Sequence, residues 1–209
     1  MKKLLLSIFT FASIVTQAQV TTVFSENIGS PTGTTVYTAY TGWQNNGTLT
    51  FTGTGDVRST SPSTNAYTGA SGAGNVFLTT NAASKTLIIS NINTIGYTAL
   101  NLAFGLMKNT TASNGSELTV EVSTDGIAYT ALSFPALPTG SGTANWKWVK
   151  ATGTIPAVAN LRIRFTNTAT TGPQFRLDDI KLTDGLAPDS ITTIPTTYGA
   201  PFCAGTAIK

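Results

Sequence analysis

The sequence predicts an all-β protein, a two-sheet antiparallel β-sandwich of the jelly-roll type. The chain is rich in Thr, Ser, Asn and Gly, and only 10% of its residues are charged. Short β-prone runs alternate with turn dipeptides, and apolar residues almost never recur at helical spacing. Many short strands between turn signals are typical of sandwiches and barrels, and long excursions between some of them favour the jelly roll.

Residues 1–18 have the pattern of a secretory signal peptide. Lys2 and Lys3 precede an apolar run over residues 4–15, and Ala18 ends a small-residue cleavage site. The apolar run is too short to span a bilayer, and no later segment approaches 18 consecutive apolar residues. We therefore expect a secreted or cell-surface protein without a membrane span.

Charge and residue usage exclude several functions. Without the signal peptide the chain has 10 basic and 9 acidic residues and no basic cluster, so nucleic-acid binding is not expected. The absence of histidine excludes Ser-His-Asp, Cys-His and common zinc catalytic sites. Glu117 and Glu121, the most closely spaced glutamates, lie about 13 Å apart along one strand, too far for paired-acid catalysis. We predict that the protein is not an enzyme.

The clearest strand pattern is a hairpin. Polar and apolar residues alternate over 117–123, the turn pair Asp125-Gly126 follows, and a partner strand is expected over 127–132. The other expected strands are 20–26, 49–52, 75–78, 85–89, 99–107, 146–152 and 160–167.

The last expected strand, 175–182, contains two adjacent carboxylates, Asp178 and Asp179. The apolar positions change parity at this pair, which predicts a β-bulge. Because side chains alternate along a strand, one carboxylate should face the core side unless such a bulge intervenes, and a carboxylate turned inward needs hydrogen-bond donors or a cation.

A structural calcium ion is one way to satisfy that carboxylate. If the first strand lies beside the last, Glu26 could share the ion with Asp178 or Asp179, helped by Asn27 or by a carbonyl from the loop that contains Asp56. The alternative is an aspartate held by backbone N–H groups or paired with Arg164 or Arg176, without a metal.

Two long irregular stretches, 29–47 and 53–74, are the expected binding loops, because loops on a rigid sandwich often hold function. Trp43 is predicted as a sugar-stacking platform for a polysaccharide or cell-surface glycan, together with Tyr40, Tyr67 and Asn45. The alternative is that these loops cover sheet edges and bury their own aromatics. Another aromatic pair, Trp146 and Trp148, shares one strand face; such a pair is more often half of a sandwich core.

The chain changes character after Gly185. Residues 19–186 are expected to form the sandwich, 187–200 form a linker rich in Pro, Ser and Thr, and 201–209 begin a following domain. Cys203, the only cysteine, would find its partner in that domain.

Several stretches together resemble a known family. They are 24–27, 69–78, 120–126, 160–165 and 175–182, and they are similar to the jelly-roll, galactose-binding-like modules of large Bacteroidetes surface proteins, including flavobacterial adhesins and gliding-motility proteins. The resemblance implies export by the type IX system and a structural calcium ion held by Glu26 and by Asp178 or Asp179. Residues 201–205 resemble the first strand of the Ig-like repeats in those proteins.

Three functions follow as hypotheses. The first is a non-catalytic extracellular adhesion or carbohydrate-binding module of a surface protein. The second is a structural spacer, and the third is an accessory domain of a modular secreted hydrolase. In each case downstream domains of the same polypeptide are expected partners.

Overall fold

A computed structural model describes residues 20–80 and 85–185 of the chain. These residues form a β-sandwich of two antiparallel sheets with one short 3-10 helix, η1 (Tyr37–Ala39). The expected all-β jelly-roll class is thereby confirmed. The expected signal peptide (1–18), linker (187–200) and following domain (201–209) lie outside the described residues.

One sheet has seven strands in the order β10-β7-β12-β5-β4-β2, with β1 also paired to β12. Its strands are β1 (Thr21–Glu26), β2 (Thr35–Val36), β4 (Asp56–Arg58), β5 (Asn75–Leu78), β7 (Leu100–Lys108), β10 (Trp146–Lys150) and β12 (Phe175–Asp184). The sequence did not predict β2 and β4, which are only two and three residues long.

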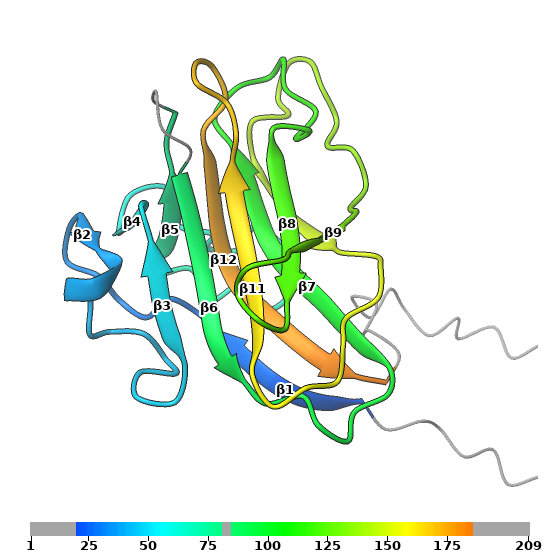
Figure 1. Cartoon of the computed structure of the whole chain (residues 1–209). Helices are drawn as coiled ribbons and strands as arrows, with labels where there is room; N and C mark the ends of the chain where they lie inside the picture. The colour runs from blue at the N-terminus through cyan, green and yellow to red at the C-terminus, as the bar shows by residue number, and fades with distance from the viewer. Residues whose placement is uncertain (1–19, 81–84, 186–209) are drawn as a thin grey trace, which may run out of the picture.

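The other sheet has five strands in the order β3-β6-β11-β8-β9 and lies in front of the first in Figure 1. Its strands are β3 (Thr50–Gly53), β6 (Lys85–Ile92), β8 (Leu118–Ser123), β9 (Thr130–Leu132) and β11 (Leu161–Asn167). The predicted hairpin is confirmed, because Val122 pairs with Thr130 across the turn. From β5 to β8 each strand joins the sheet opposite its predecessor, which is the crossing connection of a jelly roll.

The core lies between the sheets. It contains alternate residues of facing strands, such as Phe104 of β7, which meets Phe165 of β11 edge-on at 5.1 Å between ring centroids. On β12 the core residues are Leu177 and then Ile180, so the inward parity changes between them.

That change is the predicted bulge. Along β12, Asp178 lies opposite Gly105 of β7 but Lys181 lies opposite Ala103, so β12 has one extra residue. Asp179 has a φ of 49°, a left-handed conformation that the extra residue requires. The other neighbour of β12 also changes here, from β5 before the bulge to β1 after it.

Candidate binding site

Trp43, the predicted stacking platform, is buried. Its side chain is only 4% exposed, and its ring stacks on Phe51 with centroids 4.1 Å apart and 4° between the planes. Tyr37 and Tyr40 pack against it at 5.8 and 5.3 Å. Burying so large an apolar ring is strongly favourable, and the loop folds back to the end of the core to achieve it. The prediction of an exposed platform at Trp43 is wrong, and the alternative, a loop that buries its own aromatics, describes this loop.

Tyr40 and Asn45 hold the same loop in place. The Tyr40 hydroxyl donates to the carbonyl of Ile28 at 2.6 Å, and the Asn45 amide nitrogen donates to the carbonyl of Ser25 at 2.7 Å. The same amide nitrogen also donates to Oε2 of Glu26 at 2.9 Å. Both predicted ligand residues therefore lie around Glu26 rather than in an open site.

Glu26 is fully buried and its carboxylate accepts four N–H groups. Oε1 accepts the backbone N–H of Ile28 and of Gln44, both at 2.9 Å, and Oε2 accepts the backbone and side-chain N–H of Asn45. A cation bound to either oxygen would face the positive ends of these dipoles. Glu26 therefore does not fit the predicted calcium ion.

Register explains why Glu26 does not meet the aspartates. The predicted adjacency of the first and last strands is confirmed, and Glu26 lies directly opposite Ile180. Residues opposite each other in an antiparallel pair share one face, and Ile180 belongs to the core. Glu26 therefore points to the inner face of the sheet, whereas Asp178 lies one step beyond Leu177, on the outer face.

The bulge brings both aspartate side chains to the loop 59–74, which covers the outer face. Asp178 is fully buried and accepts the Ser63 hydroxyl at 2.7 Å. Asp179 accepts the Tyr67 hydroxyl at 2.6 Å and the backbone N–H of Ser71 at 3.0 Å. Neither carboxylate enters the sandwich core, which is the outcome expected if a bulge intervenes at the pair.

Burial perturbs the acidity of this cluster. Desolvation and the neighbouring Asp179 raise the pKa of Asp178 to about 7. Burial and the hydrogen bond to Asp179 raise the pKa of the Tyr67 hydroxyl well above its ordinary value. Tyr67 is therefore a protonated donor at neutral pH, and Asp178 binds a proton more readily than an exposed aspartate.

Several oxygen atoms gather at the aspartate pair. The Ser71 hydroxyl oxygen lies 3.4 Å from both carboxylate oxygens of Asp178 and 3.5 Å from the carbonyl oxygen of Asn27, so it sits loosely among three acceptors. Carboxylate, carbonyl and hydroxyl oxygens are the ligands that calcium takes. The described residues contain no group of three or more acidic, His or Cys side chains placed to hold a metal.

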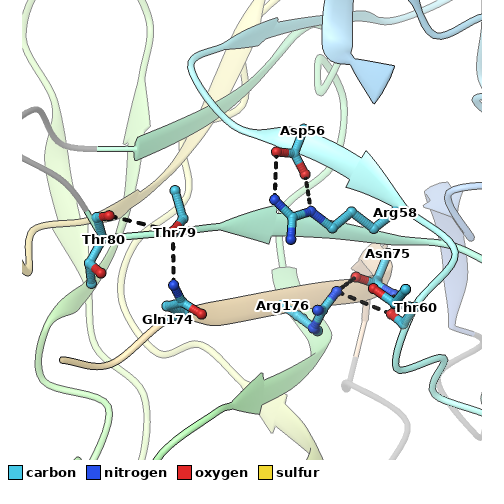
Figure 2. Close-up of polar contacts among 8 residues, drawn as sticks. All are labelled: Asp56, Arg58, Thr60, Asn75, Thr79, Thr80, Gln174 and Arg176. Carbon is cyan, nitrogen blue, oxygen red and sulfur yellow. Dashed lines mark hydrogen bonds and ion pairs between the residues drawn. The ribbon is translucent and has the colours of Figure 1, made fainter. Parts of the chain in front are cut away.

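The arginine partners weighed for the aspartates are engaged elsewhere. Arg164 donates to Glu121 at 2.8 Å. Arg176 donates to the carbonyl of Thr60 at 3.1 Å and to the side-chain oxygen of Asn75 at 2.7 Å, as Figure 2 shows. Neither of these arginines forms a pair with Asp178 or Asp179.

A neighbouring cluster closes the other end of this outer face. Arg58 donates to both carboxylate oxygens of Asp56 (Figure 2), and its guanidinium lies 3.7 Å from the Phe77 ring centroid. Arg176 approaches the same ring at 4.6 Å. Burial and the nearby Arg58 lower the pKa of Arg176. Each of these side chains has partners within the cluster. The β10 side is therefore the more open part of the outer face.

Trp148 occupies that open side. It lies opposite Gly105 of β7, which in turn lies opposite Asp178 of β12. The Tyr67 side chain lies directly over Gly105 in this row of residues. The position that a Cβ on Gly105 would occupy is only 2.0 Å from the Tyr67 hydroxyl oxygen. The rings of Tyr67 and Trp148 are 5.4 Å apart at 38°. The hydrogen bond from Tyr67 to Asp179 therefore positions the ring that supports Trp148.

The tryptophan pair, for which the sequence left core and exposed platform open, lies outside the core between the sheets. Trp146 and Trp148 both lie on the outer face, away from the core to which Val149 belongs. Trp146 is covered by the loop and donates its ring N–H to the carbonyl of Ser61 at 3.1 Å. Trp148 is half-buried. The sequence of the partner strand β7 contained a signal for the position of these rings. Ala103 and Gly105 are small and leave room beside them for large aromatic side chains.

Two grooves flank β10. One, of about 440 Å³, lies between Lys147, Trp148 and Lys150 of β10 and the segment 135–138. The other, of about 400 Å³, is lined by Trp146 and Lys147 together with loop residues that include Thr64 and Asn145. Lys147 lines both grooves, whereas Trp148 lines only the first.

Prolines keep the first groove open. Ser133 pairs with Thr152 just beyond β10, so the chain starts out beside the strand. Pro135 and Pro138 follow and have no N–H to donate, so this segment cannot continue the ladder along β10. The edge of β10 therefore faces a groove instead of another strand.

No family model matches the chain, and no curated relative matches it. The solved structures that resemble it include the following three. A family 61 carbohydrate-binding module in complex with β-1,4-galactotriose is 16% identical with a TM-score of 0.43, covering 66% of this chain and 90% of that one. The CBM22-1 xylan-binding domain of Paenibacillus barcinonensis Xyn10C is 13% identical with a TM-score of 0.42, covering 80% and 96%. The K2 cleaved adhesin domain of Lys-gingipain is 13% identical with a TM-score of 0.43, covering 71% and 97%. At these scores the function has to be argued from the chain's own site.

Proposed function

We propose that this chain is a non-catalytic carbohydrate-binding module that binds a glycan along β10. The observation that supports the proposal is the half-buried Trp148 ring, which packs against Tyr67 and lines the first groove. Sugar rings stack their C–H faces on aromatic rings, and ligand sites combine an apolar wall with a few polar groups. Tyr67 is thus the one predicted ligand residue that lies at this site.

The acidic groups support binding rather than hydrolysis. Asp178 has the raised pKa that a general acid needs, but it is fully buried beneath the loop and cannot reach a substrate. Glu121 is paired with Arg164, and Glu117 accepts the Ser113 hydroxyl at 2.7 Å. None of these carboxylates has a second one placed across an open cleft.

The proposal places the module on an exported surface protein, where it would serve in adhesion. The support is the signal-peptide pattern of residues 1–18 and the resemblance to Bacteroidetes surface modules, which also implies type IX export. Within the described residues, no helix is long and apolar enough to cross a membrane. A spacer would bind no glycan, and an accessory domain of a hydrolase would bind the substrate of its catalytic partner.

We also propose a structural calcium ion at the aspartate pair. Asp178, Asp179, the Ser71 hydroxyl and the Asn27 carbonyl would hold it, without Glu26. The ion would fasten the loop 59–74 to β12 and so hold Tyr67 beside Trp148.

The test is glycan binding by matched variants. The chain is screened on a glycan array, and affinities for the hits are measured by calorimetry for the wild type, Trp148→Ala and Tyr97→Ala. Tyr97 is a half-buried aromatic in the loop between β6 and β7 and serves as the control. We expect Trp148→Ala to lose at least tenfold in affinity and Tyr97→Ala to bind as the wild type does. Equal affinity of the Trp148→Ala variant, or no glycan bound by the wild type, would contradict the proposal.

A further inference from the structure

A buried lysine lies at the end of β7. Lys108 is only 1% exposed, and it lies opposite Phe175 of β12, which belongs to the core. Opposite residues of an antiparallel pair share one face of the sheet, so Lys108 continues the inward row of β7 that contains Phe104. Its side chain therefore enters the end of the core, where the other members of the row are apolar.

The ammonium group of Lys108 joins two loops. It donates to the carbonyl of Pro138 at 2.6 Å and also to the carbonyl of Ser113. Pro138 belongs to the segment 135–138, the wall of the first groove that faces β10, whereas Ser113 lies in the connection between β7 and β8. Lys108 therefore fastens the groove wall to a neighbouring loop from inside the molecule.

Two backbone hydrogen bonds join the same two loops. The N–H of Leu137 donates to the carbonyl of Asn114 at 2.8 Å, and the N–H of Gly140 donates to the carbonyl of Thr111 at 2.9 Å. The segment 135–138 belongs to no strand, so these contacts, the lysine and the buried Leu137 side chain set its distance from β10.

A charged side chain is a costly choice for this position. Removing an ammonium group from water is unfavourable, and an apolar side chain of similar length would fill the end of the core without that cost. What the ammonium group adds is geometry, because carbonyls from two different loops must both approach one nitrogen atom. This favours a role in positioning the wall over a role in overall stability.

We propose that Lys108 is a positioning residue of the glycan site. By holding the Pro138 carbonyl, it fixes the width of the groove between the segment 135–138 and Trp148, and so sets how well a glycan in contact with Trp148 fits the groove. Lys108 does not touch the ligand, because it is buried and acts through Pro138. This inference rests on the proposed function, because it names a further residue on which the same site depends.

The first part of the test is glycan affinity, measured by calorimetry on the full chain with glycans that the wild type binds. Lys108→Met keeps the length of the side chain and removes its donors. Lys85→Met, on β6 of the other sheet, is the control for the same substitution. Lys108→Met is measured both in the wild type and in the Trp148→Ala background.

The second part is hydrogen exchange at the amides of Leu137 and Gly140, which report on the wall. The amide of Ala151, which donates to the carbonyl of Leu102 of β7 at 2.9 Å, reports on the intact sandwich. If Ala151 loses its protection, Lys108→Met has not folded, and Lys108→Gln, which keeps a polar side chain, is measured in its place.

We expect Lys108→Met to lower the affinity about tenfold in the wild type, the scale of one lost hydrogen bond. The loss should be much smaller in the Trp148→Ala background, because without the ring the width of the groove no longer decides the fit. The wall amides should exchange about tenfold faster, on the same scale, whereas Ala151 keeps its rate, and Lys85→Met should match the wild type throughout.

Three results would overturn the inference while leaving the proposed function intact. They are an unchanged affinity in Lys108→Met, an equal loss in both backgrounds, and unchanged exchange at the wall amides. An equal loss would show a general structural defect instead of a change in the groove. Binding of no glycan by the wild type would overturn both the inference and the proposed function.

Discussion

The buried Asp178 predicts an unusual dependence of stability on pH. Its pKa is raised to about 7 in the folded chain, whereas an unfolded aspartate has a pKa of about 3.9. The folded state therefore favours the protonated form. The stability from this group is fully present below pH ~4 and is lost as pH rises through about 7. The difference between the two pKa values corresponds to at most about 4 kcal/mol of unfolding free energy.

The assay is urea unfolding at pH 5, 6, 7 and 8 in the presence of a chelator. We expect the wild type to become less stable as pH rises, and the Asp178→Asn variant, which stays neutral, to lack that slope. Asp125→Asn is the control, because hydrogen bonds from Ile127 and Ala128 lower the pKa of Asp125 and confine its effect to more acidic pH. Parallel pH profiles for the wild type and Asp178→Asn would refute the reasoning.

Three further predictions concern the loop and the core. A calcium ion at the aspartate pair should raise the melting temperature; at a calcium concentration one hundred times the Kd, the gain in unfolding free energy should be about 2.7 kcal/mol. The ion should also flatten the dependence of stability on pH. A melting temperature that is the same with and without a chelator would argue against the ion. Tyr67→Phe removes the hydrogen bond to a carboxylate and should cost about 1.5–3 kcal/mol in urea unfolding and weaken glycan binding through Trp148; wild-type affinity would show that Tyr67 does not position that ring. Tyr37→Phe removes a buried hydroxyl that has no partner and should leave the melting temperature equal or higher; a clear drop would reveal a missed partner.

The fold was predictable because its signals are local. Alternation over the hairpin strands and the turn at Asp125-Gly126 depend only on neighbouring residues. The bulge was also readable, since the parity change between Leu177 and Ile180 is a property of one strand. The short strands β2 and β4 were missed because two or three residues show no periodicity.

The site was less predictable because it depends on which faces of the strands and loops pack together in the folded chain. The sequence showed that Trp146 and Trp148 share a face, but not that this face lies outside the core. Trp43 lies in a loop without periodicity, so its burial follows from tertiary packing against Phe51. Glu26 is adjacent to β12 as expected, yet its register places it on the opposite side of the sheet from Asp178.

The pairing of β1 with β12 has a mechanical consequence for a chain under tension. Among the described residues β1 pairs only with β12, and Thr21 lies opposite Asp184, so the chain enters and leaves the domain at the same end of two adjacent strands (Figure 1). A pulling force applied at those two points would load the hydrogen bonds one pair at a time, as in a zipper, rather than all together in shear. β1 would peel away at low force as far as the bulge, while the β10 site on the far side of β7 keeps its strands. Constant-velocity pulling should show this as a small early extension before the main unfolding event, and a single high-force event would contradict it.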